Sequence, residues 1–116
     1  MDNIADLPII DWEQATRLAG NNKEFAQEIL SLLIRDLTNN VRDIKQLYLT
    51  HNYLEMQKQV HKLHGALCYC GLPRLKTIIN KLETQLKNNI MESLPHDIDM
   101  LENEVKLLLE HYSRQT

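Results

Sequence analysis

The sequence predicts an all-α fold: an antiparallel four-helix bundle with a short additional N-terminal helix. Apolar residues recur at alternating steps of three and four along most of the chain, which is the period of helices that bury one face. No segment alternates apolar and polar residues with the period of two that is typical of strands. Glycine and proline number only three each, which disfavours folds rich in tight turns. The 116 residues are expected to form one domain, 1–116.

The first two helices are predicted from the residues that precede their apolar stripes. Asp11 stands three residues before Gln14, a capping-box spacing that opens a short helix over 11–19. Asn21 stands three residues before a glutamate and is expected to open a long helix over 22–49. The apolar stripe of that long helix consists of Ala26, Leu30, Leu33, Leu37, Val41, Ile44 and Tyr48.

The remaining three helices follow from similar signals. Asn52 has the same capping spacing at the start of a helix over 53–70, and Gly71 is expected to close that helix in a left-handed conformation. A proline at the first position favours a helix over 73–88. Ser93 and Pro95 mark the start of the last helix, which is predicted over 94–112. Four long helices joined by short connections favour the antiparallel bundle.

Charge and cysteine usage exclude several classes of function. The 13 basic and 16 acidic residues give a net charge of −3, which disfavours nucleic-acid binding. The three glycines are too widely spaced for a loop that cradles the phosphates of ATP or NAD. Cys68 and Cys70 are interpreted as free thiols of a reducing compartment. No apolar run approaches the ~20 residues of a membrane span, and the acidic start is unlike a signal peptide. We therefore expect a protein of a reducing compartment without direct membrane contact.

His61 is the candidate reactive residue of the third helix. It lies about 100° around the helix from Val60 of the apolar stripe, and therefore toward solvent. Gly65 follows one turn later and leaves space beside the ring, while Lys58 and Lys62 make the surroundings basic. An imidazole is a nucleophile near neutral pH and can accept a phosphoryl group whose charge is already neutralised. An ordinary exposed histidine is the alternative interpretation. No compact acidic cluster is available for Mg²⁺, so we expect no cofactor in this chain and a metal ion supplied by the partner.

A motif of the third and fourth helices consists of His61-Lys62-Leu63-His64-Gly65-Ala66, Gly71-Leu72, Leu75 and Leu82-Glu83. It resembles the signature of the histidine-containing phosphotransfer (HPt) domain, in which His-x-Leu-Lys-Gly-Ser/Ala precedes a further glycine and a Leu-Glu pair. The Leu-His-Gly variant, together with Asp11-Trp12, is most similar to the C-terminal HPt domain of BarA/GacS-type hybrid sensor histidine kinases.

The resemblance implies a role for each matching residue. His61 corresponds to the phosphorylated histidine. His64 stands where the family usually has a lysine that helps to hold the phosphoryl oxygens, and Lys62 is a further auxiliary cation. Gly65 lets the partner approach, and Glu83 stands where a polar residue often reaches the inner nitrogen of the reactive ring. Such an acceptor would fix the tautomer and leave the outer nitrogen free as the nucleophile.

The resemblance also implies partners. His61 would accept a phosphoryl group from the receiver domain of a hybrid kinase and pass it to a response regulator. The chain would then be a carrier rather than an enzyme, a monomer, and the cytosolic end of an inner-membrane sensor kinase. Four cations, Lys58, Arg74, Lys76 and Lys81, are expected to lie near the His61 face and to steer an acidic receiver surface.

Two alternatives stay open at this point. The chain could be a helical protein-interaction module without phosphoryl chemistry. It could also bind zinc, because His61, His64 and Cys68 have a spacing that lets them face one way. That metal site would need Glu83 or another distant residue to complete it, and the metal would occupy the imidazole that phosphotransfer requires.

Overall fold

The computed structural model of the chain describes residues 4–115, which form five α-helices, one 3₁₀ helix and no strand. The elements are a 3₁₀ helix at Ile4–Asp6, α1 (Trp12–Leu18), α2 (Lys23–Leu49), α3 (Tyr53–Leu67), α4 (Pro73–Lys87) and α5 (Leu94–Gln115). The predicted all-α fold is confirmed, and the short 3₁₀ helix is an element that the sequence analysis did not anticipate.

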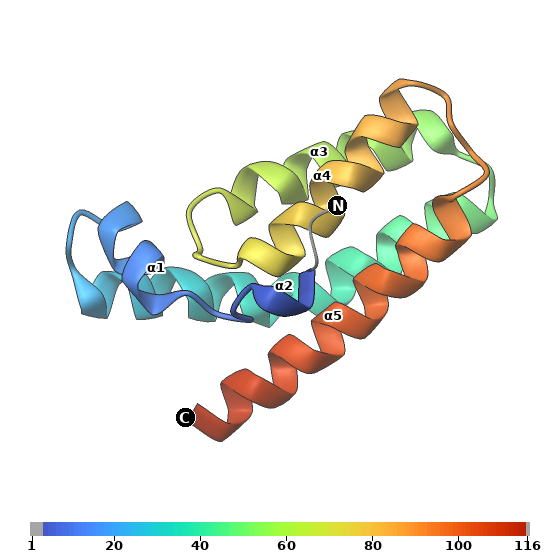
Figure 1. Ribbon diagram of the computed structural model, residues 1–116. Helices are drawn as coiled ribbons and strands as arrows, with labels where there is room; N and C mark the ends of the chain where they lie inside the picture. The colour runs from blue at the N-terminus through green and yellow to red at the C-terminus, as the bar shows by residue number, and fades with distance from the viewer. Residues whose placement is uncertain (1–3, 116) are drawn as a thin grey trace.

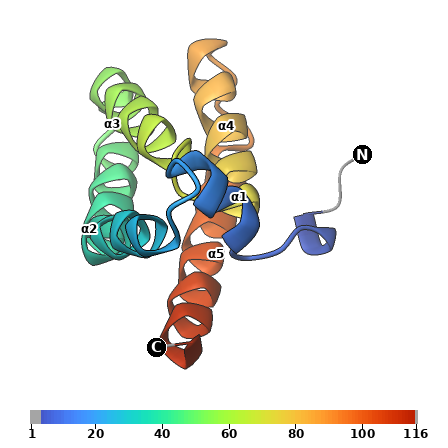
Figure 2. The same ribbon diagram turned by 90° about the vertical axis from the view of Figure 1, so that its left-hand side faces the viewer.

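The four long helices run antiparallel, each packed against the next along the chain (Figure 1). Contacts between α2 and α5 close the ring, and α1 lies across the N-terminal end of α2. Seen end-on, the four long helices enclose the core and α1 covers one end of it (Figure 2). The largest fully buried side chains are Leu30, Leu37, Ile44, Met56, Leu67, Leu72, Leu75, Ile79, Leu82, Leu94, Leu101 and Leu108. This core holds α3 and α4 side by side, which is the arrangement on which the site depends.

The helix starts agree with the predicted caps in two cases and differ in one. The carboxylate of Asp11 accepts a hydrogen bond from the backbone N–H of Gln14 at 2.9 Å, and Asn52 caps α3 in the same way. The cap of α2 is Asn22 rather than the predicted Asn21. Asn21 has φ 63° and continues the left-handed turn that begins at Gly20, so the helix starts one residue later.

Helix α3 ends at Leu67, three residues before the predicted end at residue 70. The next three backbone N–H groups bond to carbonyls three residues earlier, at 3.3–3.4 Å, so the last turn tightens. Gly71 then adopts φ +64° and brings the chain into α4. The apolar period continues through this turn because Cys70 remains buried, which explains why the pattern alone overestimated the helix.

The turn between α3 and α4 contacts the start of α1 at Gly71. Its carbonyl accepts a hydrogen bond from the N–H of Asp11 at 2.8 Å. A Cβ added at Gly71 would lie 2.6 Å from the carbonyl oxygen of Asp11 and 2.7 Å from the Cβ of Ala15. A side chain at this position would therefore meet backbone, in addition to the strain of the left-handed conformation.

We expect Gly71→Ala to lower the free energy of unfolding by about 2 kcal/mol or more, since the left-handed strain alone amounts to about 1–3 kcal/mol. The matched control is Gly65→Ala in α3, where an added Cβ meets nothing within 4 Å. That variant should gain up to about 1 kcal/mol from the better helix former. Urea unfolding of both variants measures the difference, and similar effects at the two glycines would contradict this role of Gly71.

Candidate functional site

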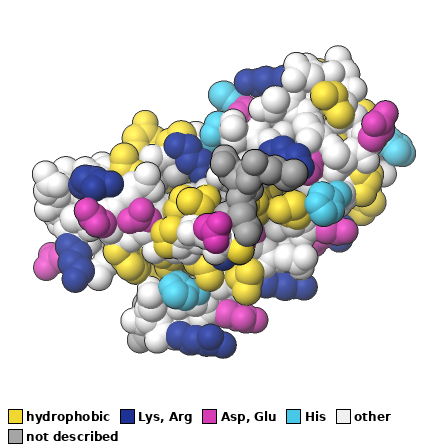
Figure 3. All heavy atoms as spheres, viewed as in Figure 1, with side chains coloured by type: hydrophobic (Ala, Val, Ile, Leu, Met, Phe, Trp, Pro, Cys, Tyr) yellow, Lys and Arg dark blue, Asp and Glu magenta, His cyan; other side chains and the backbone are white. Residues whose placement is uncertain are grey.

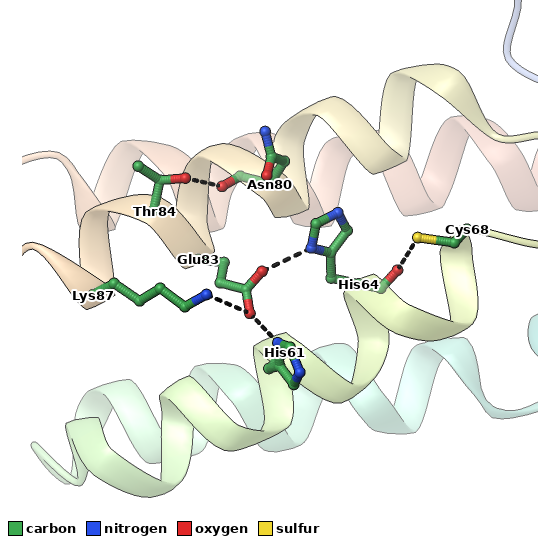
Figure 4. Close-up of polar contacts among 7 residues, drawn as sticks. All are labelled: His61, His64, Cys68, Asn80, Glu83, Thr84 and Lys87. Atoms are coloured by element: carbon green, nitrogen blue, oxygen red, sulfur yellow. Dashed lines mark hydrogen bonds and ion pairs between the residues drawn. The ribbon is translucent and has the colours of Figure 1, made fainter.

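Two histidines of α3 share one carboxylate of α4 (Figure 4). The Nδ1 of His61 lies 2.5 Å from Oε2 of Glu83, and the Nδ1 of His64 lies 2.7 Å from Oε1. The side chain of Glu83 is only 6% exposed, whereas those of His64 and His61 are 22% and 72% exposed. Each oxygen of a buried carboxylate is thus taken by one imidazole, and the outer ring faces solvent.

The local fold places these groups by helix geometry. His61 and His64 are three residues apart and therefore neighbours on one side of α3. Glu83 follows directly after the buried Leu82 on the side of α4 that packs against α3. A glutamate this deeply buried needs hydrogen-bond donors, and the two rings supply them.

Glu83 is ionised at neutral pH despite its burial. Burial raises the pKa of its carboxyl, but hydrogen bonds from His64 and His61 and the charge of Lys87 together lower this pKa below its ordinary value of 4.5. The Nζ of Lys87 lies 3.8 Å from Oε2. An ionised carboxylate only accepts hydrogen bonds, so each ring must present a proton on Nδ1. In a neutral His61 ring the lone pair then lies on Nε2.

The exposed edge of His61 opens on a shallow hollow of about 380 Å³. The hollow is lined by Leu54, Gln57, Lys58, His61 and Lys87. Gly65, one turn after His61, has open space where a side chain would stand. A partner can therefore approach Nε2 without displacing a side chain at Gly65, and two cations border the approach.

His64 has a partner that the sequence analysis did not assign to it. Its Nδ1 is bonded to Glu83, so only Nε2 is left to contact a phosphoryl group, and the ring is largely covered. The structure thus directs His64 to the carboxylate. The expectation that it holds phosphoryl oxygens stays a prediction.

The expectation that four cations share the His61 face is wrong for two of them. Arg74 forms an ion pair with Glu104 of α5 at 3.0 Å and is 17% exposed. Lys81 pairs with Asp97 of α5 at 3.3 Å. Both lie about 160–180° around α4 from Glu83, which is the side that faces α5.

The other predicted cations divide between two faces. Lys58 lies beside His61 in the hollow. Lys76 is exposed and, being seven residues before Glu83, lies on the same side of α4. Lys62, predicted to be auxiliary to His61, instead lines a separate hollow with Asn40 of α2, because successive helix residues diverge by about 100°.

Lys87 belongs to the site and was missed by the sequence analysis. It borders both the Glu83 carboxylate and the hollow beside His61. The signal was present, because a lysine four residues after a glutamate is a favourable helix pair. This spacing alone does not assign Lys87 to a site. The assignment follows only from the position of Glu83 beside His61.

The metal-binding alternative is not supported by the arrangement of its proposed ligands. The thiol of Cys68 donates to the carbonyl of His64 in its own helix, at 3.4 Å. Cys70 is buried in the core as a packing residue, and this burial, with the neighbouring Cys68, raises the pKa of its thiol to about 11. Across residues 4–115, no three histidine, cysteine or acidic side chains come together as metal ligands.

Within residues 4–115, neither the surface charge on the face shown in Figure 3 nor the apolar character of the helices indicates a further type of site. On this face, acidic and basic side chains are interspersed (Figure 3). None of the helices between residues 4 and 115 combines the length and apolar character needed to cross a bilayer.

Comparison with known proteins places this geometry in a family. The family model described as "Hpt domain" matches residues 28–114. The crystal structure of the HPT domain from a sensor hybrid histidine kinase of Shewanella superposes with a TM-score of 0.75 at 25% sequence identity. The match covers 91% of this chain and 95% of that one.

Sequence relatives are much longer proteins. The sensor histidine kinase GacS of Pseudomonas protegens is 29% identical over 107 residues, covering 87% of this chain and 12% of the relative. The sensor protein GacS of Pseudomonas syringae pv. syringae is 30% identical over 93 residues, covering 78% and 10%. The signal transduction histidine-protein kinase BarA of Escherichia coli K12 is 29% identical over 83 residues, covering 72% and 9%. The chain thus spans about a tenth of the length of these relatives.

Proposed function

The chain belongs to the Hpt domain family, whose members carry phosphoryl groups in phosphorelays, and we propose that His61 is the residue that carries the group here. The observation that supports this most directly is the exposed ring of His61 with its Nδ1 bonded to the buried carboxylate of Glu83. This arrangement holds the inner nitrogen and leaves Nε2 as a nucleophile that a partner can reach.

The transfer is a nucleophilic displacement at phosphorus. The lone pair of His61 Nε2 attacks the phosphorus of an aspartyl phosphate, the N–P bond forms, and the bond to the aspartate oxygen breaks. The aspartate leaves as a carboxylate, and the ring gains positive charge while it keeps its Nδ1 proton. The ionised Glu83 stabilises that charge through the hydrogen bond at 2.5 Å. Onward transfer to a second aspartate is the same step in reverse.

Mg²⁺ is assigned to the partner in this proposal. The carboxylate that contacts His61 already accepts bonds from two imidazoles and lies beside the cation of Lys87, so it is engaged within this chain. The partner's own acidic residues would then supply the metal that neutralises the transferred group. The chain's own contribution is to orient the nucleophile and to stabilise its charge.

The proposed partners are receiver domains: one in a hybrid kinase as donor and a response regulator as acceptor. The named relatives are sensor kinases, which supports a place for this domain at the cytosolic side of such a protein. Lys58, Lys76 and Lys87 border the His61 face and would attract the acidic surface that surrounds a phosphorylatable aspartate. We propose a monomer that binds each receiver transiently, without nucleic acid.

Incubation with a receiver domain that carries labelled phosphate on its aspartate tests this function. We expect the label to move to this chain and to be stable in alkali but not in acid, as is typical of an N–P bond. Absence of transfer from a panel of phosphorylated receivers, including those of GacS- and BarA-type kinases, would contradict the proposal and favour a module that only binds proteins.

Gly65→Leu is expected to separate docking from folding. An added Cβ meets nothing within 4 Å on the exposed side of α3, so stability should hold or rise by up to about 1 kcal/mol. The leucine would project beside His61 where the receiver must bring its aspartate close, and we expect at least a tenfold loss in transfer rate, comparable with other misplacements of reacting groups. Unfolding and transfer are measured on the same preparation. An unchanged rate would show that the receiver does not pass over Gly65.

A further inference from the structure

We propose that His64 is a positioning residue for phosphoryl transfer: by holding Oε1 of Glu83, it keeps Oε2 aimed at the Nδ1 of His61. This inference rests on the proposed function of His61. In this role His64 acts already in the unphosphorylated protein, because it influences the ring of His61 through the carboxylate that both rings share.

The first support is the division of the carboxylate. Each oxygen of Glu83 has its own imidazole donor, at 2.5 Å from His61 and 2.7 Å from His64. The side chain of Glu83 is 6% exposed, so without His64 the oxygen Oε1 would have lost its donor in a site where water has little access. The carboxylate would then be free to rotate toward Lys87, whose Nζ lies 3.8 Å from Oε2, the oxygen that His61 binds.

The second support is the difference in burial between the two rings. The His61 side chain is 72% exposed, so packing does not fix its orientation. The bond to Glu83 is therefore what determines which nitrogen of His61 carries the proton. The His64 side chain is only 22% exposed and therefore has less freedom to reorient, so it can serve as the fixed point. Figure 4 shows Glu83 extending from α4 between the two rings of α3.

The positioning role differs in its consequences from a direct hold on the phosphoryl oxygens. A residue that holds the oxygens acts only when the phosphoryl group is present. With its Nδ1–H bonded to Glu83, His64 could donate to those oxygens only from Nε2–H, in a doubly protonated and positively charged ring. A residue that positions Glu83 needs only an N–H donor, and it changes the tautomer of His61 in the free protein. The state of the unphosphorylated ring therefore distinguishes the two roles.

The test uses His64→Phe, which keeps a ring but has no donor, and His64→Asn, whose amide N–H can replace Nδ1–H. Nitrogen NMR at pH 8 reports which nitrogen of His61 is protonated, and transfer from a phosphorylated receiver reports the rate. We expect His64→Phe to shift His61 toward the Nε2–H tautomer and to lower the rate roughly tenfold, as losses of such supporting hydrogen bonds do in other sites. His64→Asn should restore both to within about twofold, and His96→Phe on α5 is the matched control.

The wild-type spectrum provides a measurement that does not depend on the folding of any variant. Both His61 and His64 must be protonated at Nδ1, and finding His64 in the Nε2–H form would overturn the proposal. A His64→Phe protein with wild-type tautomer and rate would also overturn it while leaving the carrier function of His61 intact. Failure of the wild-type protein to accept phosphate would instead refute the carrier function.

Discussion

His61→Gln is expected to abolish phosphoryl acceptance while the fold persists. Glutamine has no nucleophilic nitrogen, so no N–P bond can form at this position. Its amide can still donate to Glu83, and the replaced side chain is mostly exposed, so we expect the free energy of unfolding to change by less than about 1 kcal/mol. Labelling from a phosphorylated receiver and urea unfolding measure the two effects.

The matched control for this variant is His96→Gln, at an exposed histidine of α5. It should accept phosphate at the wild-type rate, which shows that the loss is not a general effect of removing a histidine. Undiminished labelling of His61→Gln would mean that another residue carries the phosphoryl group.

Glu83→Leu is expected to lower the rate of acceptance by about 100-fold, since it removes the partner that orients the reactive imidazole and stabilises its charge. Glu83→Leu should also lower the free energy of unfolding, because the partly buried Nδ1–H of His64 loses its acceptor, so urea unfolding has to confirm that the variant is folded under the assay conditions. Glu83→Gln keeps one acceptor oxygen and should give an intermediate rate. A Glu83→Leu protein that transfers at the wild-type rate would show that His61 needs no partner at Nδ1.

The same residue predicts the dependence of stability on pH. The pKa of Glu83 in the folded protein lies below its ordinary value of 4.5. Its stabilising contribution is therefore complete above the ordinary pKa and is lost as the pH falls through the lower folded pKa. The difference in unfolding free energy between wild type and Glu83→Gln should be greatest above about pH 5 and shrink in more acidic solution. Urea unfolding between pH 3 and pH 7 measures it, and a difference that is constant over this range would contradict the ion-pair account.

The helices and the exposed position of His61 could be predicted from the sequence because both depend on local spacing. The apolar period determines which side of α3 is buried, and it places His61 beside that stripe. The caps of α1 and α3 are likewise contacts within four residues, at Asp11 and Asn52. The cap of α2 shifted to Asn22 because the left-handed turn continues through Asn21, and nothing in the capping spacing reports φ.

The organisation of the site depended on contacts between helices, which spacing does not determine. The resemblance directed Glu83 toward His61, but only the packing of α4 on α3 shows that His64 binds the other oxygen. Arg74 is a second example. In the sequence it is one of several cations, and only the packing of α4 on α5 shows that it is buried against Glu104. The pKa of Glu104 is raised by burial more than Arg74 lowers it, which marks this pair as interior to the bundle.

The position of the phosphoryl group on the ring of His61 tests the central claim most directly. Phosphorus–nitrogen NMR correlations on the phosphorylated protein identify the nitrogen that bears the group. Because Glu83 holds Nδ1, we expect the phosphoryl group on Nε2 of His61, with the Nδ1 proton still bonded to the carboxylate. A phosphoryl group on Nδ1, or on any other residue, would contradict the account.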